Sequence, residues 1–127
     1  MGFRMDFSKD IFLALPTGLY TVQVNSYEEK QIQKEDSKYV GSPMLAWELE
    51  VTDGEHAGRK LFYNTIMIDE FSGQYRRLAE ACGQDIDDTQ ELEVNPDDLI
   101  GAVCQAEVGI RKYSGRDVND IKSLLPT

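Results

Sequence analysis

The chain has 127 residues and a formal net charge of −10, from 23 acidic and 13 basic side chains. This length suits a single domain, residues 1–127, with a core that needs neither a disulfide framework nor a structural metal ion. No apolar run is long enough to cross a bilayer, and the N-terminus lacks the layout of a signal peptide. We therefore expect a cytoplasmic protein with no membrane contact.

The negative charge is unevenly distributed along the sequence. The stretch from Gln84 to Asp98 contains seven acidic residues and no Lys or Arg. Outside this stretch, 16 acidic and 13 basic residues remain. An anionic ligand is therefore not excluded, provided that the acidic stretch lies away from the binding face.

The first part of the chain predicts one long strand after a leader. Residues 1–15 carry scattered apolar side chains and are expected to pack across the domain. After Pro16, Thr17 and Gly18, apolar and polar residues alternate from Leu19 to Lys30, which is typical of a strand. Residues 31–42 are polar and predict a loop.

The stretch from Pro43 to Ile68 predicts an antiparallel hairpin around a loop at residues 53–58. Trp47 alternates with polar neighbours and shares its face with Leu49, so core packing is favoured over base stacking. Phe62 and Tyr63 point to opposite faces of the second strand. The sequence alone does not decide which of these two rings enters the core.

The second half predicts one helix and a second hairpin. Ser72 is expected to cap a helix that ends at Gly83, and residues 96–99 predict a short helical turn. Strands are expected at 101–113 and 116–124, joined by a tight turn at Ser114 and Gly115. Cys82 and Cys104 are too far apart for a zinc knuckle and predict buried free thiols.

The element order is three strands, a helix and two more strands. This order predicts an all-β fold with one helix: a five-stranded OB-like Greek-key barrel whose helix lies between strands 3 and 4 and plugs one end. Other small barrels and sandwiches share the same order.

No motif for catalysis is visible, so we expect no enzyme, no catalytic residue and no cofactor. The single histidine, His56, falls in the loop at 53–58 without partners for metal binding or general-base chemistry. Acidic pairs such as Asp97 and Asp98 could chelate a hard cation, but solvated surface charge is the simpler interpretation.

Basic and aromatic residues gather in three places where an OB barrel holds its ligand. Single-stranded nucleic acid needs cations for its phosphates and rings on which its bases stack. Such binding tolerates any sequence and weakens as salt rises. The predicted contact residues are Lys30, Lys34, Lys38 and Tyr39 in the first loop, Arg59, Lys60 and Tyr63 on the third strand, and Arg111, Lys112, Tyr113 and Arg116 in the last hairpin.

Three stretches resemble a family of small single-stranded DNA-binding proteins encoded by bacteriophages and prophages. They are LPTGLYTVQVNSYEEKQ, GSPMLAWELEVTDGEHAGRKLF and LIGAVCQAEVGIRKYSGRDVNDI. The resemblance implies an OB fold and non-catalytic coating of single-stranded DNA in the bacterial host cell, beside phage replication or recombination proteins. Arg59, Tyr113 and Asn119 match the pattern of the family. The ending DIKSLLPT departs from the acidic tail of housekeeping single-strand binders.

A non-catalytic protein-interaction module on the same barrel is the alternative. It accounts for the net acidity without a basic groove, and it is favoured if Glu48 and Glu50 interrupt the positive track. Edge strands of small barrels also allow a homodimer.

Overall fold

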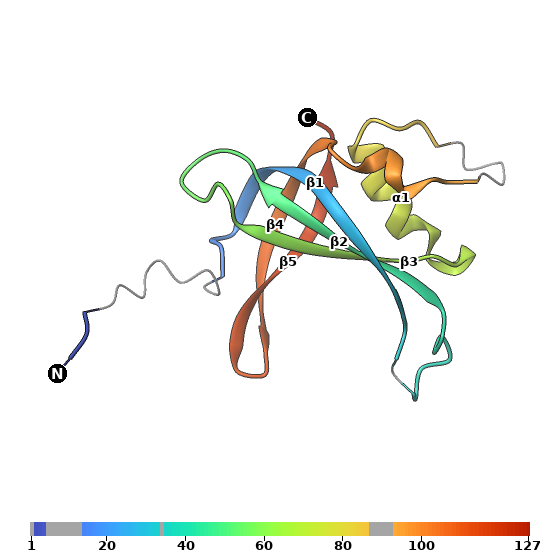
Figure 1. Ribbon diagram of the computed structural model, residues 1–127, viewed down its shortest axis with the longest axis horizontal. Coiled ribbons are helices and arrows are strands. Elements are labelled where there is room, and N and C mark those ends of the chain that lie inside the picture. The colour runs from blue at the N-terminus through green and yellow to red at the C-terminus, as the bar shows by residue number, and fades with distance from the viewer. Residues whose placement is uncertain (1, 5–13, 34, 87–92) are drawn as a thin grey trace.

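Five antiparallel strands and one α-helix make up the computed structural model, which describes residues 2–4, 14–33, 35–86 and 93–127 (Figure 1). Most of the predicted leader and Lys34 lie outside the described residues. The elements are β1 (Gly18–Gln31), β2 (Pro43–Val51), β3 (Lys60–Ile66), the 3-10 helix η2 (Asp69–Phe71), α1 (Ser72–Ala81), the 3-10 helix η3 (Pro96–Leu99), β4 (Val103–Tyr113) and β5 (Arg116–Leu125).

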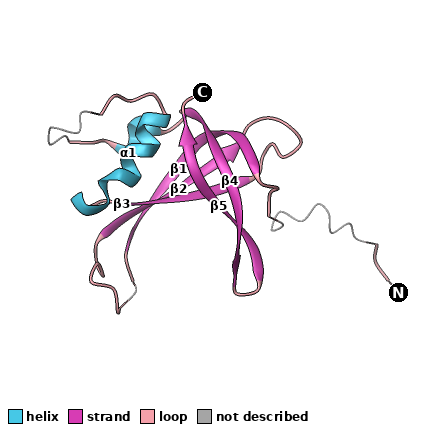
Figure 2. Ribbon diagram, turned by 180° about the vertical axis from the view of Figure 1, so that it is seen from behind, coloured by secondary structure: helices cyan, strands magenta, loops and turns pink. Residues whose placement is uncertain are grey.

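The strands form one sheet in the order β3-β2-β1-β4-β5, and every neighbouring pair is antiparallel. The predicted five strands, with a helix between strands 3 and 4, are confirmed. The predicted closure is not: the sheet is open, with β3 and β5 at its two edges. These edges nevertheless approach each other, and α1 contacts both of them, so the sheet is strongly curved (Figure 2).

A bulge in β1 divides this strand between two partners. Residues 18–23 of β1 pair with β4, and the strand pairs with β2 from Val22 onward, with a shift of register between Val24 and Ser26. An extra residue of this kind bends a strand and increases its twist. Beyond the bulge β1 pairs with β2 alone, while β2 stays paired with β3 as far as Met44. We call the projecting end of β1 and β2, with the loop at residues 32–42 that joins them, the β1–β2 arm (Figure 1).

Trp47 lies at the centre of the core and is fully buried. Its indole N–H donates to the Thr65 hydroxyl on β3 across 3.0 Å. The rings of Tyr27 from β1 and Tyr75 from α1 lie 5.1 Å and 6.3 Å from it, centroid to centroid. The prediction that Trp47 packs in the core is confirmed, because one side chain joins three strands and the helix.

Helix α1 begins differently from the prediction. Ser72 is its first helical residue, and Phe71 occupies the cap position without a side-chain hydrogen bond. The reason is that η2 runs directly into α1, so the backbone is already helical at Ser72. The predicted end is confirmed, since the positive φ of 95° at Gly83 reverses the chain. None of the described helices is long and apolar enough to span a membrane.

The two cysteines are free and lie together. Cys104 on β4 is buried, as predicted, whereas Cys82 at the end of α1 is only half-buried. A hydrogen bond with the Cys104 thiol lowers the pKa of Cys82. The same hydrogen bond, together with burial, raises the pKa of Cys104, so Cys82 is the more acidic thiol of the pair.

The end of the leader is tied to the second hairpin by Asn119. The Asn119 carboxamide accepts from the Leu15 N–H at 2.8 Å and donates to the Leu15 carbonyl at 2.9 Å and the Gly109 carbonyl at 3.3 Å. The Leu15 side chain is fully buried in the core. Asn119, which matched the pattern of the DNA-binding family, therefore has a structural role here.

We predict that Leu15→Ala destabilises the protein by about 2–5 kcal/mol, because it removes buried methyl groups and leaves a cavity. Leu19→Ala is the matched control: Leu19 is 53% exposed, and its loss should change the free energy of unfolding by less than about 0.5 kcal/mol. Urea unfolding followed by circular dichroism measures both. Equal effects of the two substitutions would show that Leu15 does not belong to the core.

Candidate nucleic-acid interface

The β1–β2 arm carries one aromatic residue with a cation over it. Lys38 Nζ lies 5.0 Å from the centroid of the Tyr39 ring, within the range of a cation–π contact. Tyr39 also packs edge-on against Phe71, with centroids 4.9 Å apart, which fixes the loop against the start of α1. Lys30, also predicted as a contact, instead faces Glu28 at 3.8 Å.

The β4–β5 hairpin forms a second arm and carries a similar pair. Ser114 and Gly115 have φ angles of 50° and 77°, the left-handed values that a tight two-residue hairpin turn requires. Tyr113 is 62% exposed, and the Arg111 guanidinium lies 5.8 Å from the centroid of its ring. Arg116 is directly opposite Tyr113 in the ladder, so its side chain projects to the same face of the hairpin as the exposed ring.

Lys112 is partly neutralised on this arm. Its ammonium lies 2.7 Å from an Asp117 carboxylate oxygen on the opposite strand. Both side chains are at least half exposed, so the ion pair is screened and holds Lys112 only weakly. The arm therefore keeps a positive tip.

Among the predicted contact residues, Lys60 is the one whose surroundings are least favourable for binding a phosphate. Its ammonium forms a hydrogen-bonded ion pair with Glu50 and lies 3.7 Å from Glu48 Oε2. Asn25 Nδ2 donates to both carboxylates, at 3.3 Å and 3.2 Å. The Lys60 hydrogen bond, with that of Asn25, lowers the pKa of Glu50, and the same ion pair raises the pKa of Lys60. Carboxylates therefore interrupt the positive track on the outer face of β2, which is the arrangement expected of a protein-interaction module.

The structure shows which of the two β3 rings enters the core. Tyr63 faces inward and its hydroxyl donates to the Gln74 carbonyl of α1 at 2.9 Å, so it anchors the helix. Phe62 is 66% exposed on the outer face. The outward ring is therefore Phe62, which was not among the predicted contact residues. Arg59 immediately precedes β3, and its carbonyl accepts from the Val51 N–H at 2.9 Å.

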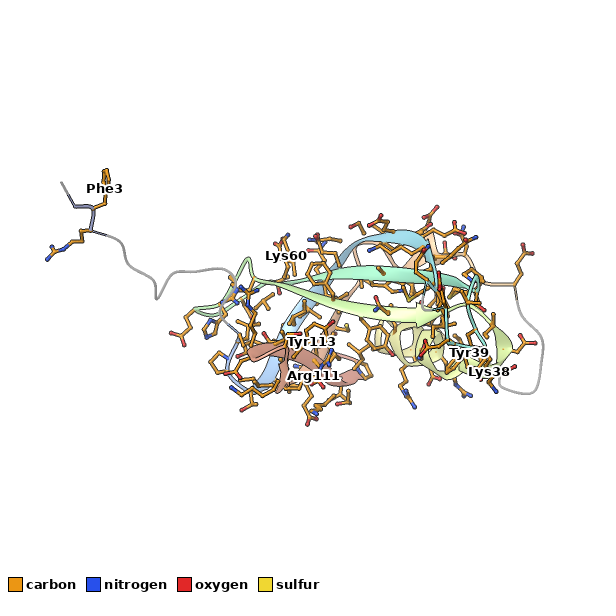
Figure 3. The ribbon with its side chains drawn as sticks, turned by 90° about the horizontal axis from the view of Figure 1, so that it is seen from below. Phe3, Lys38, Tyr39, Lys60, Arg111 and Tyr113 are labelled. Atoms are coloured by element: carbon orange, nitrogen blue, oxygen red, sulfur yellow. The ribbon has the colours of Figure 1, made fainter. Side chains whose placement is uncertain are left out.

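The predicted contact residues thus fall into three groups. Figure 3 shows Lys38 with Tyr39 towards one end of the molecule and Arg111 with Tyr113 towards the other, with Lys60 set apart from both pairs. The two arms project in the same direction (Figure 1). The arms, rather than the sheet between them, present rings with cations beside them.

Comparison with known proteins identifies one family. Residues 4–127 match the family described as "Protein of unknown function (DUF669)". The chain belongs to this family. A search of the curated proteins finds no match.

The described residues offer no cluster of side chains that could bind a metal ion. Among them, no three His, Cys, Asp or Glu side chains lie close enough together to hold a metal ion. His56 Nε2 lies 3.4 Å from Glu55 Oε1. The His56 ring packs edge-on against the ring of Tyr20, with centroids 6.0 Å apart.

We predict that Lys60→Met raises the pKa of Glu50 towards its usual value, because the hydrogen bond that favours the carboxylate is lost. In the native protein this bond contributes stability above the pKa of Glu50 in the unfolded chain, and the contribution disappears as pH falls through the lower folded value. Carboxyl ¹³C NMR titration measures the pKa. Lys30→Met, whose partner is Glu28, should leave Glu50 unchanged, and a rise of the same size there would show that long-range charge is responsible.

Proposed function

We propose that this protein binds single-stranded DNA without sequence preference and acts beside phage replication or recombination proteins. The observation that carries the proposal is the matched pair of arms, each presenting a cation within about 6 Å of an aromatic ring centroid. Single-stranded binding needs a flat ring for a base and a positive charge for the adjoining phosphate. The resemblance of three long stretches to phage single-strand binders points to the same function.

The positions of the arms support a strand that contacts both of them. They project in the same direction (Figure 1). The β4–β5 arm is a two-stranded ribbon beyond Val108, whereas the β1–β2 arm has β3 beside β2 as far as Met44. The turn at Ser114 and Gly115 has free space around Gly115, so a ligand can approach the backbone closely. A strand lying across both arms would stack on Tyr39 and Tyr113 and place phosphates near Lys38, Arg111 and Arg116.

We propose further that the curved sheet is an OB-type barrel with an incomplete seam. The strand order β3-β2-β1-β4-β5 puts β3 and β5 in the position of the strands that would meet if the sheet closed. The contact between these strands, and the position of α1 against both, support this assignment. In an OB barrel, the loops between strands 1 and 2 and between strands 4 and 5 flank the ligand, and here these connections are the two arms.

The carboxylates on β2 limit where phosphates can lie. Glu48 and Glu50 face outward, and their charge exceeds that of Lys60 between them. A phosphate placed over this part of the sheet would be repelled, since like charges in partly desolvated surroundings interact strongly. The proposal therefore assigns the phosphate contacts to the arms and leaves Lys60 out of them.

Fluorescence anisotropy with a labelled oligo(dT) should show binding that exceeds binding to duplex DNA of the same length and weakens as salt rises. For single strands the slope of log K against log salt is about −0.7 per phosphate contact. Arg111→Gln should therefore reduce the magnitude of this slope by about 0.7. Arg77→Gln on α1 makes the same change of charge away from the β4–β5 arm and should leave the slope unchanged. Salt-independent binding, or equal slopes for both variants, would contradict the proposal.

Tyr113→Ala should weaken oligo(dT) binding by about 5- to 160-fold, because stacking of one base is worth about 1–3 kcal/mol. Tyr113→Phe keeps the ring and should bind within about twofold of the native protein. Thermal unfolding should be nearly unchanged in both variants, since Tyr113 lies at the exposed tip of the hairpin. Native affinity in Tyr113→Ala would remove this ring from the interface.

A further inference from the structure

The outer face of the β2–β3 hairpin carries an exposed ring beside a carboxylate. Phe62 and Glu48 are directly opposite each other in the antiparallel ladder. Side chains at such positions project to the same face, with Cβ atoms about 4.5–5.5 Å apart. Phe62 is 66% exposed, and the Glu48 side chain is 34% exposed, so both are open to a partner.

Glu48 retains an oxygen for such a partner. Both hydrogen-bond or ion-pair contacts of its carboxylate go to Oε2, from Asn25 Nδ2 at 3.3 Å and Lys60 Nζ at 3.7 Å. Among the described residues, none makes a hydrogen bond or ion pair with Glu48 Oε1. Lys60 is engaged mainly with Glu50, one position further along the same face. These contacts fix the carboxylate in place without using its second oxygen.

We propose that Glu48 and Phe62 form a docking site for an arginine side chain of a partner polypeptide, separate from the two arms. A planar guanidinium can stack on the Phe62 ring while one of its N–H groups donates to Glu48. A lysine ammonium cannot do both with the same geometry, because it is a compact and strongly hydrated charge. A nucleic acid strand is disfavoured, because its phosphates would lie over Glu48 and Glu50.

The surroundings of the pair indicate the kind of segment that carries the arginine. Along the same face the next opposed pairs are Ala46 with Asn64, and Met44 with Ile66. The face therefore becomes less charged towards the start of β2. One guanidinium on an open sheet buries too little surface to bind alone, so the partner must add contacts. An arginine next to apolar residues fits this gradient, and the net charge of −10 favours a basic partner.

The test is an NMR titration of the ¹⁵N-labelled full chain, without DNA, with a blocked hexapeptide that has one arginine between two leucines. The same peptide with lysine or citrulline in place of arginine provides the comparison. The arginine peptide should shift the amide signals of Glu48 and Phe62 with a saturable curve. The lysine peptide should bind at least about fivefold more weakly, and the citrulline peptide should cause no saturable shift.

Two variants and one control locate the site. Glu48→Gln and Phe62→Ala should each weaken arginine-peptide binding by at least about fivefold, and circular dichroism checks that both remain folded. Glu107→Gln removes the same charge from the outer face of β4 and should bind like the native protein. Native affinity in the two site variants, or unsaturable shifts spread over many acidic residues, would overturn the inference.

An oligo(dT) titration separates the two ligands. Shifts confined to the arms, with the peptide still bound, would support two sites. Displacement of the peptide together with shifts at Glu48 and Phe62 would show that nucleic acid covers this face, which would overturn the docking site and leave DNA binding intact. Conversely, peptide binding in a protein that ignores oligo(dT) would support the docking site and refute the proposed function.

Discussion

The bulge in β1 is the constraint on which the shape of the molecule depends. As the central strand, β1 pairs with β2 along one edge and with β4 along the other, and the extra residue between Val24 and Ser26 bends it close to the point where pairing with β4 stops. Before the bulge, β1 holds the centre of the sheet. After it, β1 continues with β2, which still has β3 on its other side, and β4 and β5 continue beyond Gly18 at the start of β1. Both arms thus follow from the limited overlap between β1 and its second partner.

The arms also separate the positive side chains from the carboxylates of this strongly acidic chain. Arg111 and Arg116 lie at the end of one arm, and Lys38 lies in the loop of the other. The carboxylates of Glu48 and Glu50 lie on the sheet, where Lys60 and Asn25 hold them. If the arms bind nucleic acid and the sheet face binds an arginine, one small fold presents surfaces of opposite sign without a second domain.

Much of the fold was predictable because periodicity reports which residues share a face. The alternation around Trp47 gave the strand and its buried side, and the turn at Ser114 and Gly115 gave the second hairpin. Closure of the sheet depends on the approach of two distant strands, which no local pattern encodes. The ion pair between Lys60 and Glu50 could have been predicted from the sequence, since a hairpin with its loop at 53–58 places these residues directly opposite each other. Phe62 and Tyr63 could not be told apart, because the choice depends on where α1 offers a carbonyl to Tyr63.

The sole tryptophan has a practical consequence for anyone who studies ligands of this protein. Trp47 is enclosed by Tyr27, Tyr75 and Thr65 and is out of contact with solvent. A base stacked at the end of either arm would not reach the indole of Trp47, so tryptophan emission should stay constant while ligand binds. The same emission should shift to longer wavelength as soon as water enters the interior. Tryptophan fluorescence will therefore report unfolding of the core, whereas a binding measurement needs a label on the ligand.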